Sequence, residues 1–117
     1  MSKLKQEIKT ELGDKPYQRD QLNNLAYLNY CVKEALRLDT PTSFSPYKVK
    51  HNFTLKGKTN TYHIPKGVIF SANPYVSHFV GEVWHKAEQF IPERWDPEHE
   101  YFKLPSNPSE KRHPNMF

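Results

Sequence analysis

The first residues of the chain place hydrophobic side chains at helical spacing. Leu4, Ile8 and Leu12 recur at every fourth position among Lys and Glu residues. Gly13 follows directly, and glycine is the usual residue just past a helix end because it tolerates a positive φ angle. The pattern therefore predicts a helix over residues 1–13.

A second hydrophobic stripe predicts a longer helix over residues 20–39. Asp20 is a suitable N-cap at its start, and Pro41 stands where a helix has to stop. The stripe is most simply a core-facing surface. Its members are Leu22, Leu25, Leu28, Val32, Ala35 and Leu36.

The hydrophobic period shortens over residues 46–73, which predicts a small antiparallel sheet. Four short β-prone runs are separated by turn residues at Gly57 and at the Pro-Lys-Gly of residues 65–67. The runs are Tyr47–Val49, Phe53–Leu55, Tyr62–Ile64 and Val68–Ala72.

Residues 74–117 read as a connection followed by a coil. Prolines at positions 92, 97, 105, 108 and 114 disfavour regular structure, because each removes a backbone donor. Two helices, a small antiparallel sheet and a proline-rich coil make the predicted fold class α+β.

Composition limits what such a chain can build. The 117 residues amount to one domain at most, and with 36% hydrophobic residues the core is expected to be thin or borrowed. The 17 Lys and Arg and 13 Asp and Glu are mixed along most of the chain, so the net charge of +4 argues little for nucleic acid. The longest apolar runs fall well short of the roughly 20 residues that span a bilayer.

Metal and disulfide frameworks find no support in the pattern. A single cysteine, Cys31, excludes an internal disulfide and multi-cysteine zinc sites. The six histidines lack the i, i+4 spacing that puts two ligands on one helix face, so no metal site is predicted.

Glu34 and Arg37 stand three residues apart on the longer predicted helix, where their side chains are neighbours. Taken alone the pair is most simply a solvated ion pair, since such pairs arise readily by chance and contribute about 0–1 kcal/mol. Other short motifs change that interpretation by their order along the chain. They are Leu-Ala-Tyr-Leu at 25–28, Ile-Pro-Lys-Gly at 64–67, His78 with Trp84, and Phe-Ile-Pro-Glu-Arg-Trp at 90–95.

This series resembles the cytochrome P-450 family of haem-thiolate monooxygenases, in which an E-x-x-R helix precedes an I-P-K-G turn, an H-R-D-P-x-x-W segment and P-E-R-F or P-E-R-W. The likeness implies a C-terminal-half fragment of a mainly-α fold, from the end of the J helix through the E-x-x-R helix to the meander. It implies a parent protein that binds haem b, oxidises a small lipophilic substrate with molecular oxygen and takes electrons from a reductase.

The resemblance also assigns roles to individual residues. Glu34 and Arg37 match the E-x-x-R pair, and Arg94 matches the arginine of P-E-R-F that joins them in a buried structural triad. Lys48 falls where the family has an arginine that pairs with a haem propionate, although an exposed strand lysine is an equal alternative. Substrate-pocket lining is implied for Thr42, Ser43 and Phe44.

Two departures from the family pattern stand out. His-Phe-Val-Gly at residues 78–81 replaces H-R-D-P, and the ligand loop F-x-x-G-x-R-x-C-x-G does not occur in the chain. Cys31 lies in mid-helix beside Val32, which suits an inert hydrophobe and not an axial thiolate. We therefore expect this chain alone to hold no catalytic residue, to bind no haem stably and to be inactive.

Three hypotheses follow from the sequence. The chain is part of a P-450, as an incomplete gene model or a truncated product; or a non-catalytic remnant that docks onto another protein; or a small basic module whose lysines between positions 48 and 58 bind an anionic partner. Attachment to the endoplasmic reticulum is implied only by the resemblance to eukaryotic members. The substrate is left open.

Overall fold

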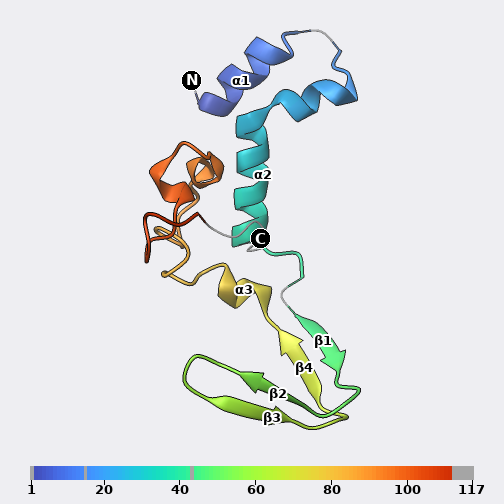
Figure 1. The fold of residues 1–117 in the computed structure, drawn as a ribbon. Helices are drawn as coiled ribbons and strands as arrows, with labels where there is room; N and C mark the ends of the chain where they lie inside the picture. Colours follow the sequence, from blue (N-terminus) through green and yellow to red (C-terminus); the bar gives the residue numbers. More distant parts are fainter. Residues whose placement is uncertain (1, 15, 43, 112–117) are drawn as a thin grey trace. The chain divides into compact units, whose positions relative to one another are not determined.

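A computed structural model describes residues 2–14, 16–42 and 44–111 (Figure 1). The chain divides into two compact units, each treated separately below. The helical unit comprises Met1–Pro41 with Tyr75–Phe117, and the sheet unit comprises Thr42–Pro74. Helices and short antiparallel ladders together confirm the predicted α+β class.

The N-terminal helix α1 runs over Lys3–Glu11 and confirms the first hydrophobic pattern. Leu12 is its C-cap, and Gly13 beyond it has a φ of 62°. That left-handed conformation is the one in which a residue without Cβ has no steric penalty, so the helix stops where the glycine predicts.

The prediction of one continuous helix over residues 20–39 is wrong. A 3₁₀ helix, η1, covers Arg19–Asn24, and the α-helix α2 covers Ala26–Leu38. Leu25 separates them with a non-helical ψ of 81°, and its side chain is completely buried. Burial of a leucine is worth about 2 kcal/mol, more than the roughly 1 kcal/mol that one backbone hydrogen bond contributes net.

Asp20 is not the N-cap that the sequence predicts. Gln18 caps η1, because the Gln18 side chain and backbone exchange hydrogen bonds with Gln21 in a capping box. Asp20 lies two residues after this cap, as the second residue of η1.

The sheet unit is a hairpin nested within a second ladder, as Figure 1 shows. Strands β1 (Ser45–Lys48) and β4 (Ile69–Ala72) pair in antiparallel fashion, and between them β2 (Phe53–Lys56) pairs with β3 (Thr61–Ile64). The four β-prone runs are thereby confirmed within a residue or two. The ladders are two-stranded, so the single small sheet of the prediction is two adjoining ones.

The remaining elements are short. They are α3 (Pro74–Ser77), η2 (Pro92–Trp95) and η3 (Glu100–Phe102), the last two being 3₁₀ helices. The prediction of a structureless proline-rich coil is wrong at η2 because Pro92 occupies the first position of that helix. A missing N–H costs nothing there, since the first turn has no acceptor for it.

The interior of the helical unit is charged as well as apolar. Side chains that are almost completely buried in this unit include Leu25, Trp84, Glu34, Arg37 and Arg94. Charged residues are rarely buried unless they are paired, so this cluster is the candidate for a functional role.

Candidate functional site

Glu34 lies between two arginines in the interior of the helical unit. Arg37, one turn later on α2, donates from Nε and Nη2 to the two carboxylate oxygens at 3.0 and 2.8 Å. Arg94 on η2 donates from Nε to Glu34 Oε1 at 2.8 Å. All three side chains have an exposed fraction of 0%, which rules out a solvated ion pair. We call these three residues the clamp.

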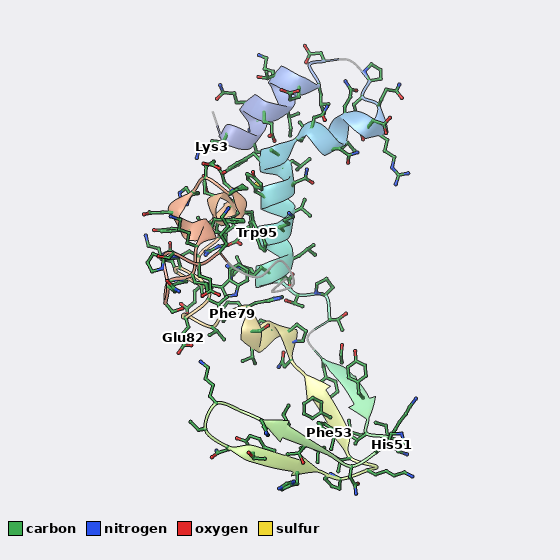
Figure 2. All side chains as sticks on the ribbon, viewed as in Figure 1. Lys3, His51, Phe53, Phe79, Glu82 and Trp95 are labelled. Carbon is green, nitrogen blue, oxygen red and sulfur yellow. The ribbon has the colours of Figure 1, made fainter. Side chains whose placement is uncertain are left out.

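Two further donors complete the surroundings of the carboxylate. The backbone N–H of Ile91 donates to Oε1 and the indole N–H of Trp95 donates to Oε2, each at 3.0 Å. Figure 2 shows Trp95 beside α2. Burial by itself would raise the pKa of Glu34, but the hydrogen bonds from Arg37 and Ile91 and the charges of the arginines outweigh it and lower the pKa.

Backbone carbonyls hold the outer nitrogens of the arginines. Arg37 Nη1 donates to the His78 carbonyl at 2.8 Å, and Arg94 Nη1 donates to the His85 carbonyl at 2.6 Å. Both guanidiniums also donate to the Gln89 carbonyl at 3.2 Å. The segment of residues 78–91 is thus held by its carbonyls and contains no α-helix or strand.

Lys86 adds a carbonyl to this set at a conformational cost. The Lys86 carbonyl accepts from Arg94 Nη2 at 3.3 Å, and the backbone of Lys86 has a φ of 46°. A left-handed conformation costs a residue with a side chain on the order of 1–2 kcal/mol. The geometry of the clamp accordingly holds a strained turn in place.

The clamp can position chain segments but offers no bond-making chemistry. A carboxylate that is fully occupied by donors cannot act as a general base, and guanidiniums stay protonated. Its physical effect is to tie α2 to η2 and to the irregular segment between them.

His78 forms a second buried contact at the end of α2. Its Nδ1 lies 3.1 Å from the Arg37 carbonyl oxygen and 2.8 Å from Thr40 Oγ1. Since a carbonyl only accepts, Nδ1 carries the proton in that contact. Burial lowers the pKa of His78, and the charge of Arg37 lowers it further, against the raising effect of the backbone hydrogen bond.

Acidic residues outside the clamp join α1 to the rest of the helical unit. Glu7 accepts from the backbone N–H groups of Tyr27 and Leu28 at 2.7 and 2.9 Å, and so caps α2 from a neighbouring helix. Glu93 accepts from Lys3 Nζ at 2.7 Å and from the Tyr27 hydroxyl at 3.1 Å. Burial, together with Glu93, raises the pKa of Tyr27 to about 12.

These roles of Glu7, Glu93 and His78 were not predicted from the sequence. Their partners lie 20 to 90 residues away in the chain, so no local pattern indicates them. The one available signal is that Leu25, just before α2, cannot cap a helix with its own side chain.

The other predicted site residues belong to the sheet unit. Lys48 is exposed on β1, where it pairs with Ile69 of β4. Thr42 and Phe44 are exposed, Phe44 by 62%. Ser43 lies outside the described residues. The roles that the resemblance implies for these four positions stay predictions.

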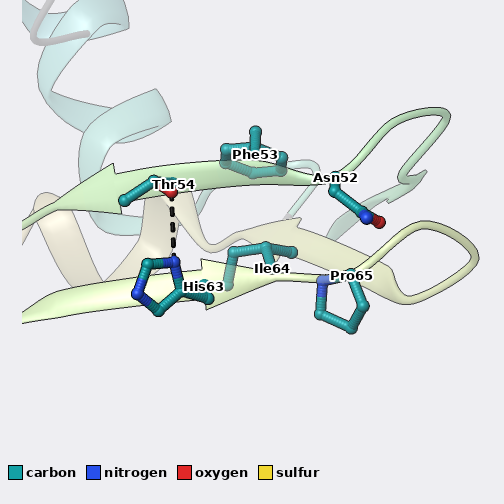
Figure 3. Close-up of a pocket in the computed structure, with 6 residues that line it drawn as sticks. All are labelled: Asn52, Phe53, Thr54, His63, Ile64 and Pro65. Carbon is teal, nitrogen blue, oxygen red and sulfur yellow. Dashed lines mark hydrogen bonds between the residues drawn. The ribbon is translucent and has the colours of Figure 1, made fainter.

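Open hollows also lie on the sheet unit. One of about 420 Å³ lies beside the β2–β3 ladder, where Thr54 and His63 contact each other at 3.2 Å (Figure 3). A second of about 430 Å³ has a mostly apolar lining that includes Tyr47, Phe53 and Phe70. Both are open to solvent.

Cys31 does not fit the axial position of a haem-thiolate site. Its side chain is half-buried on α2, and burial together with the charges of Glu93 and Glu7 raises the pKa of the thiol. A thiolate ligand needs the opposite, an electropositive setting. Within the described residues, no three His, Cys, Asp or Glu side chains lie together in a way that could hold a metal ion.

None of the helices in the described residues is both long and apolar enough to span a bilayer.

Comparison with known proteins places the chain in a wider group. Residues 1–115 match the cytochrome P-450 family model. A C-22 sterol desaturase of Candida albicans is 38% identical over 77 residues, which are 66% of this chain and 14% of that protein. Cytochrome P-450 82A1 of Pisum sativum is 35% identical over 97 residues, 81% of this chain and 17% of its own length.

An isoflavone 2'-hydroxylase of Glycyrrhiza echinata is 31% identical over 105 residues, which are 89% of this chain and 20% of the hydroxylase. The chain therefore spans between about a seventh and a fifth of the length of these three relatives.

Proposed function

The chain belongs to the cytochrome P-450 family, and we propose that it serves as the clamp-bearing segment of a haem-dependent monooxygenase. The parent enzyme oxidises a small lipophilic organic substrate with molecular oxygen and receives its electrons from a reductase. Relatives whose names describe a sterol desaturase and an isoflavone hydroxylase support this class of substrate.

The observation that carries the proposal is the complete burial of Glu34 between Arg37 and Arg94. Removing one partner of a buried ion network leaves the others desolvated and typically costs about 3–5 kcal/mol. A network of that strength makes η2 and the segment after it a fixed platform for whatever follows in the parent chain.

By itself the chain is proposed to be inactive. The pKa of the Cys31 thiol is raised, which disfavours the thiolate that haem ligation needs, and Cys31 is the single cysteine of the sequence. We further propose that Lys48 contacts a haem propionate in the parent, because its ammonium is exposed on β1 and can pair with a carboxylate. Thr42, Ser43 and Phe44 are proposed to line the substrate pocket.

The clamp is tested in the full reading frame that contains this chain. Arg37→Lys keeps the charge but loses the forked hydrogen bond, and Arg94→Ala removes the second cation. We expect both variants to lose most of their haem, whereas Arg19→Ala, at an exposed arginine of η1, keeps it. Normal haem content in both clamp variants would contradict the proposal.

Inactivity is tested on the 117-residue chain directly. Purified chain with added haem is reduced and exposed to carbon monoxide, and the expected spectrum has no thiolate-type band. Such a band would show that Cys31 ligates iron, which Cys31→Ser would verify by abolishing it.

A different function, binding of an anionic partner, is favoured by one observation. All 13 Asp and Glu residues lie outside Thr42–Pro74, which contains five lysines at positions 48, 50, 56, 58 and 66. If this surface binds a polyanion, affinity for heparin or single-stranded DNA falls steeply with salt and with Lys56→Glu. An affinity that changes with neither would remove this candidate.

A further inference from the structure

The three side chains of the clamp carry an excess positive charge that they do not balance among themselves. Two guanidiniums face one carboxylate, and all three groups are shielded from water. An excess positive charge in the interior is costly unless something with negative potential faces it. The carbonyls of residues 78, 85, 86 and 89 supply part of that potential.

The face of a tryptophan ring supplies more. Trp84 is buried to within 1% of full burial, and its ring centroid lies 5.2 Å from Arg37 Cζ and 5.9 Å from Arg94 Cζ. A tryptophan face is the strongest cation–π acceptor among the side chains, and the interaction grows when the pair is desolvated. The Trp84 indole N–H donates to the Ser77 carbonyl at 3.0 Å, which fixes the ring in this position.

The second tryptophan acts on the carboxylate. Trp95 directs its indole N–H to Glu34 Oε2, and its ring lies 5.5 Å from that of Trp84 at an angle of 56°. Phenylalanine, which the family pattern allows at this place, has no such donor. Trp95 thus adds a hydrogen bond to Glu34 Oε2, the oxygen that also accepts from Arg37 Nε.

We propose that Trp84 and Trp95 are positioning residues of the clamp: Trp84 is the shared π acceptor of both arginines, and Trp95 is the side-chain donor that completes the shell of Glu34. This inference deepens the proposed role of the clamp and rests on it. The clamp and the two tryptophans then form a five-residue network, in which Trp84 faces the positive charges and Trp95 binds the negative one.

The donor role of Trp95 is tested by NMR, because the chain contains only two tryptophans and so gives two indole N–H signals. Trp84→Phe and Trp95→Phe assign them. We expect the Trp95 signal to exchange slowly with solvent and, in Glu34→Gln, to lose at least tenfold more of its protection than the Trp84 signal, whose N–H donates to the Ser77 carbonyl. Glu88→Gln, at an exposed carboxylate, should leave both signals unchanged. An equal loss of protection at both signals in folded Glu34→Gln would overturn this role.

A variant that fails to fold need not block this test. In the unsubstituted chain, the Trp95 indole signal should shift as acid protonates Glu34, before the far-ultraviolet circular dichroism changes. An indole shift that only accompanies global unfolding would also overturn the donor role.

The acceptor role of Trp84 is tested by fluorinated tryptophans, which withdraw electrons from the ring face with little change of shape. In the Trp95→Phe background only Trp84 carries the label. We expect the unfolding equilibrium constant to rise stepwise from unlabelled to trifluorinated tryptophan, by about two- to fivefold over the series. A flat series would overturn the acceptor role.

If Trp95→Phe does not fold, the fluorinated tryptophans are incorporated into the unsubstituted chain instead. We expect the unfolding equilibrium constant to rise along the series there too, and an unchanged constant would contradict the acceptor role. None of these measurements needs haem. The tryptophan roles can therefore fail while the clamp still retains haem in the parent, and the haem experiment can fail while the tryptophan contacts stand.

Discussion

Glu34 is the residue through which α2 and η2 are joined. Its carboxylate receives Arg37 from its own helix and Arg94 from a position 60 residues later, so one side chain serves a local and a distant contact. A neutral amide of the same size can accept at one oxygen only, and its NH₂ group would face a guanidinium.

Glu34→Gln is accordingly expected to lower the free energy of unfolding by about 3–5 kcal/mol, because two buried cations lose their counter-charge. Urea denaturation followed by tryptophan fluorescence measures the change. Glu88→Gln is the matched control, at an exposed position, and should stay within about 0.5 kcal/mol of the unsubstituted chain. A similar loss in both variants would contradict a special role for Glu34.

The lowered pKa of Glu34 gives this contact a pH dependence. A carboxyl whose pKa is lower when folded contributes stability above its ordinary value of 4.5, and that stability is lost as pH falls through the folded pKa. Acid unfolding below pH 4.5 should therefore be less steep in Glu34→Gln than in the unsubstituted chain.

His78 predicts a second pH window. Its pKa is lowered from the ordinary 6.5 by burial, so the unfolded chain takes up the proton first and stability falls as pH drops below 6.5. His78→Asn offers a neutral N–H near the position of Nδ1 and should flatten the dependence between pH 6.5 and 5. His63→Asn, at an exposed strand position, should leave it intact, and identical profiles for all three chains would rule His78 out.

At the scale of elements, α2 begins without a capping side chain of its own. Leu25 stands at the N-cap, and its side chain is buried in the core. The carboxylate of Glu7 on α1 instead accepts from the backbone N–H groups of Tyr27 and Leu28 in the first turn of α2. The negative charge also lies at the positive end of the helix dipole. One residue thus caps α2 and attaches α1, which has no buried side chain of its own.

Glu7→Ala is expected to cost about 1–2 kcal/mol of unfolding free energy, in the upper range for an N-cap because a helix contact is lost together with the cap. Glu11→Ala on the same helix, where the side chain is exposed, is the control and should cost under about 0.5 kcal/mol. Thermal unfolding followed by circular dichroism compares them. Equal effects would mean that the cap contributes nothing.

For the whole molecule, the division into two units predicts unequal local stability. The charged cluster holds the helical unit, whereas Val49 is the only hydrophobic residue counted as buried among the described part of the sheet unit. Amides of β2 and β3 are expected to exchange with solvent at least tenfold faster than those in the middle of α2.

Hydrogen exchange read by mass spectrometry measures this difference. In Glu34→Gln the α2 amides should lose protection while those of the β1–β4 ladder keep theirs. Uniform protection over both units, or a parallel loss in both, would show a single cooperative unit instead.

Some parts of this structure are predictable from the sequence and others are not. The strands were predictable because hydrophobic runs and turn residues are local signals, and Gly13 marked the end of α1 correctly. Glu34, Arg37 and Arg94 were found through the order of short motifs, since no local rule would bring together residues 60 positions apart.

The failures have a common physical origin. The break at Leu25 and the capping by Glu7 both depend on tertiary contacts that override local helix preference. The left-handed backbone of Lys86 is likewise imposed by the turn that serves Arg94, because nothing in the residue type favours it.

Pairing of β1 with β4 has a kinetic consequence. Ser45 and Ala72 are partners across that ladder, so the intervening chain leaves and returns at one place. Once the ladder has formed, the loop that must close to join Glu34 to Arg94 is effectively about half as long, which saves about 0.5 kcal/mol of closure entropy. If the sheet unit folds first, the contact between Glu34 and Arg94 therefore forms faster, because a shorter effective loop has to close.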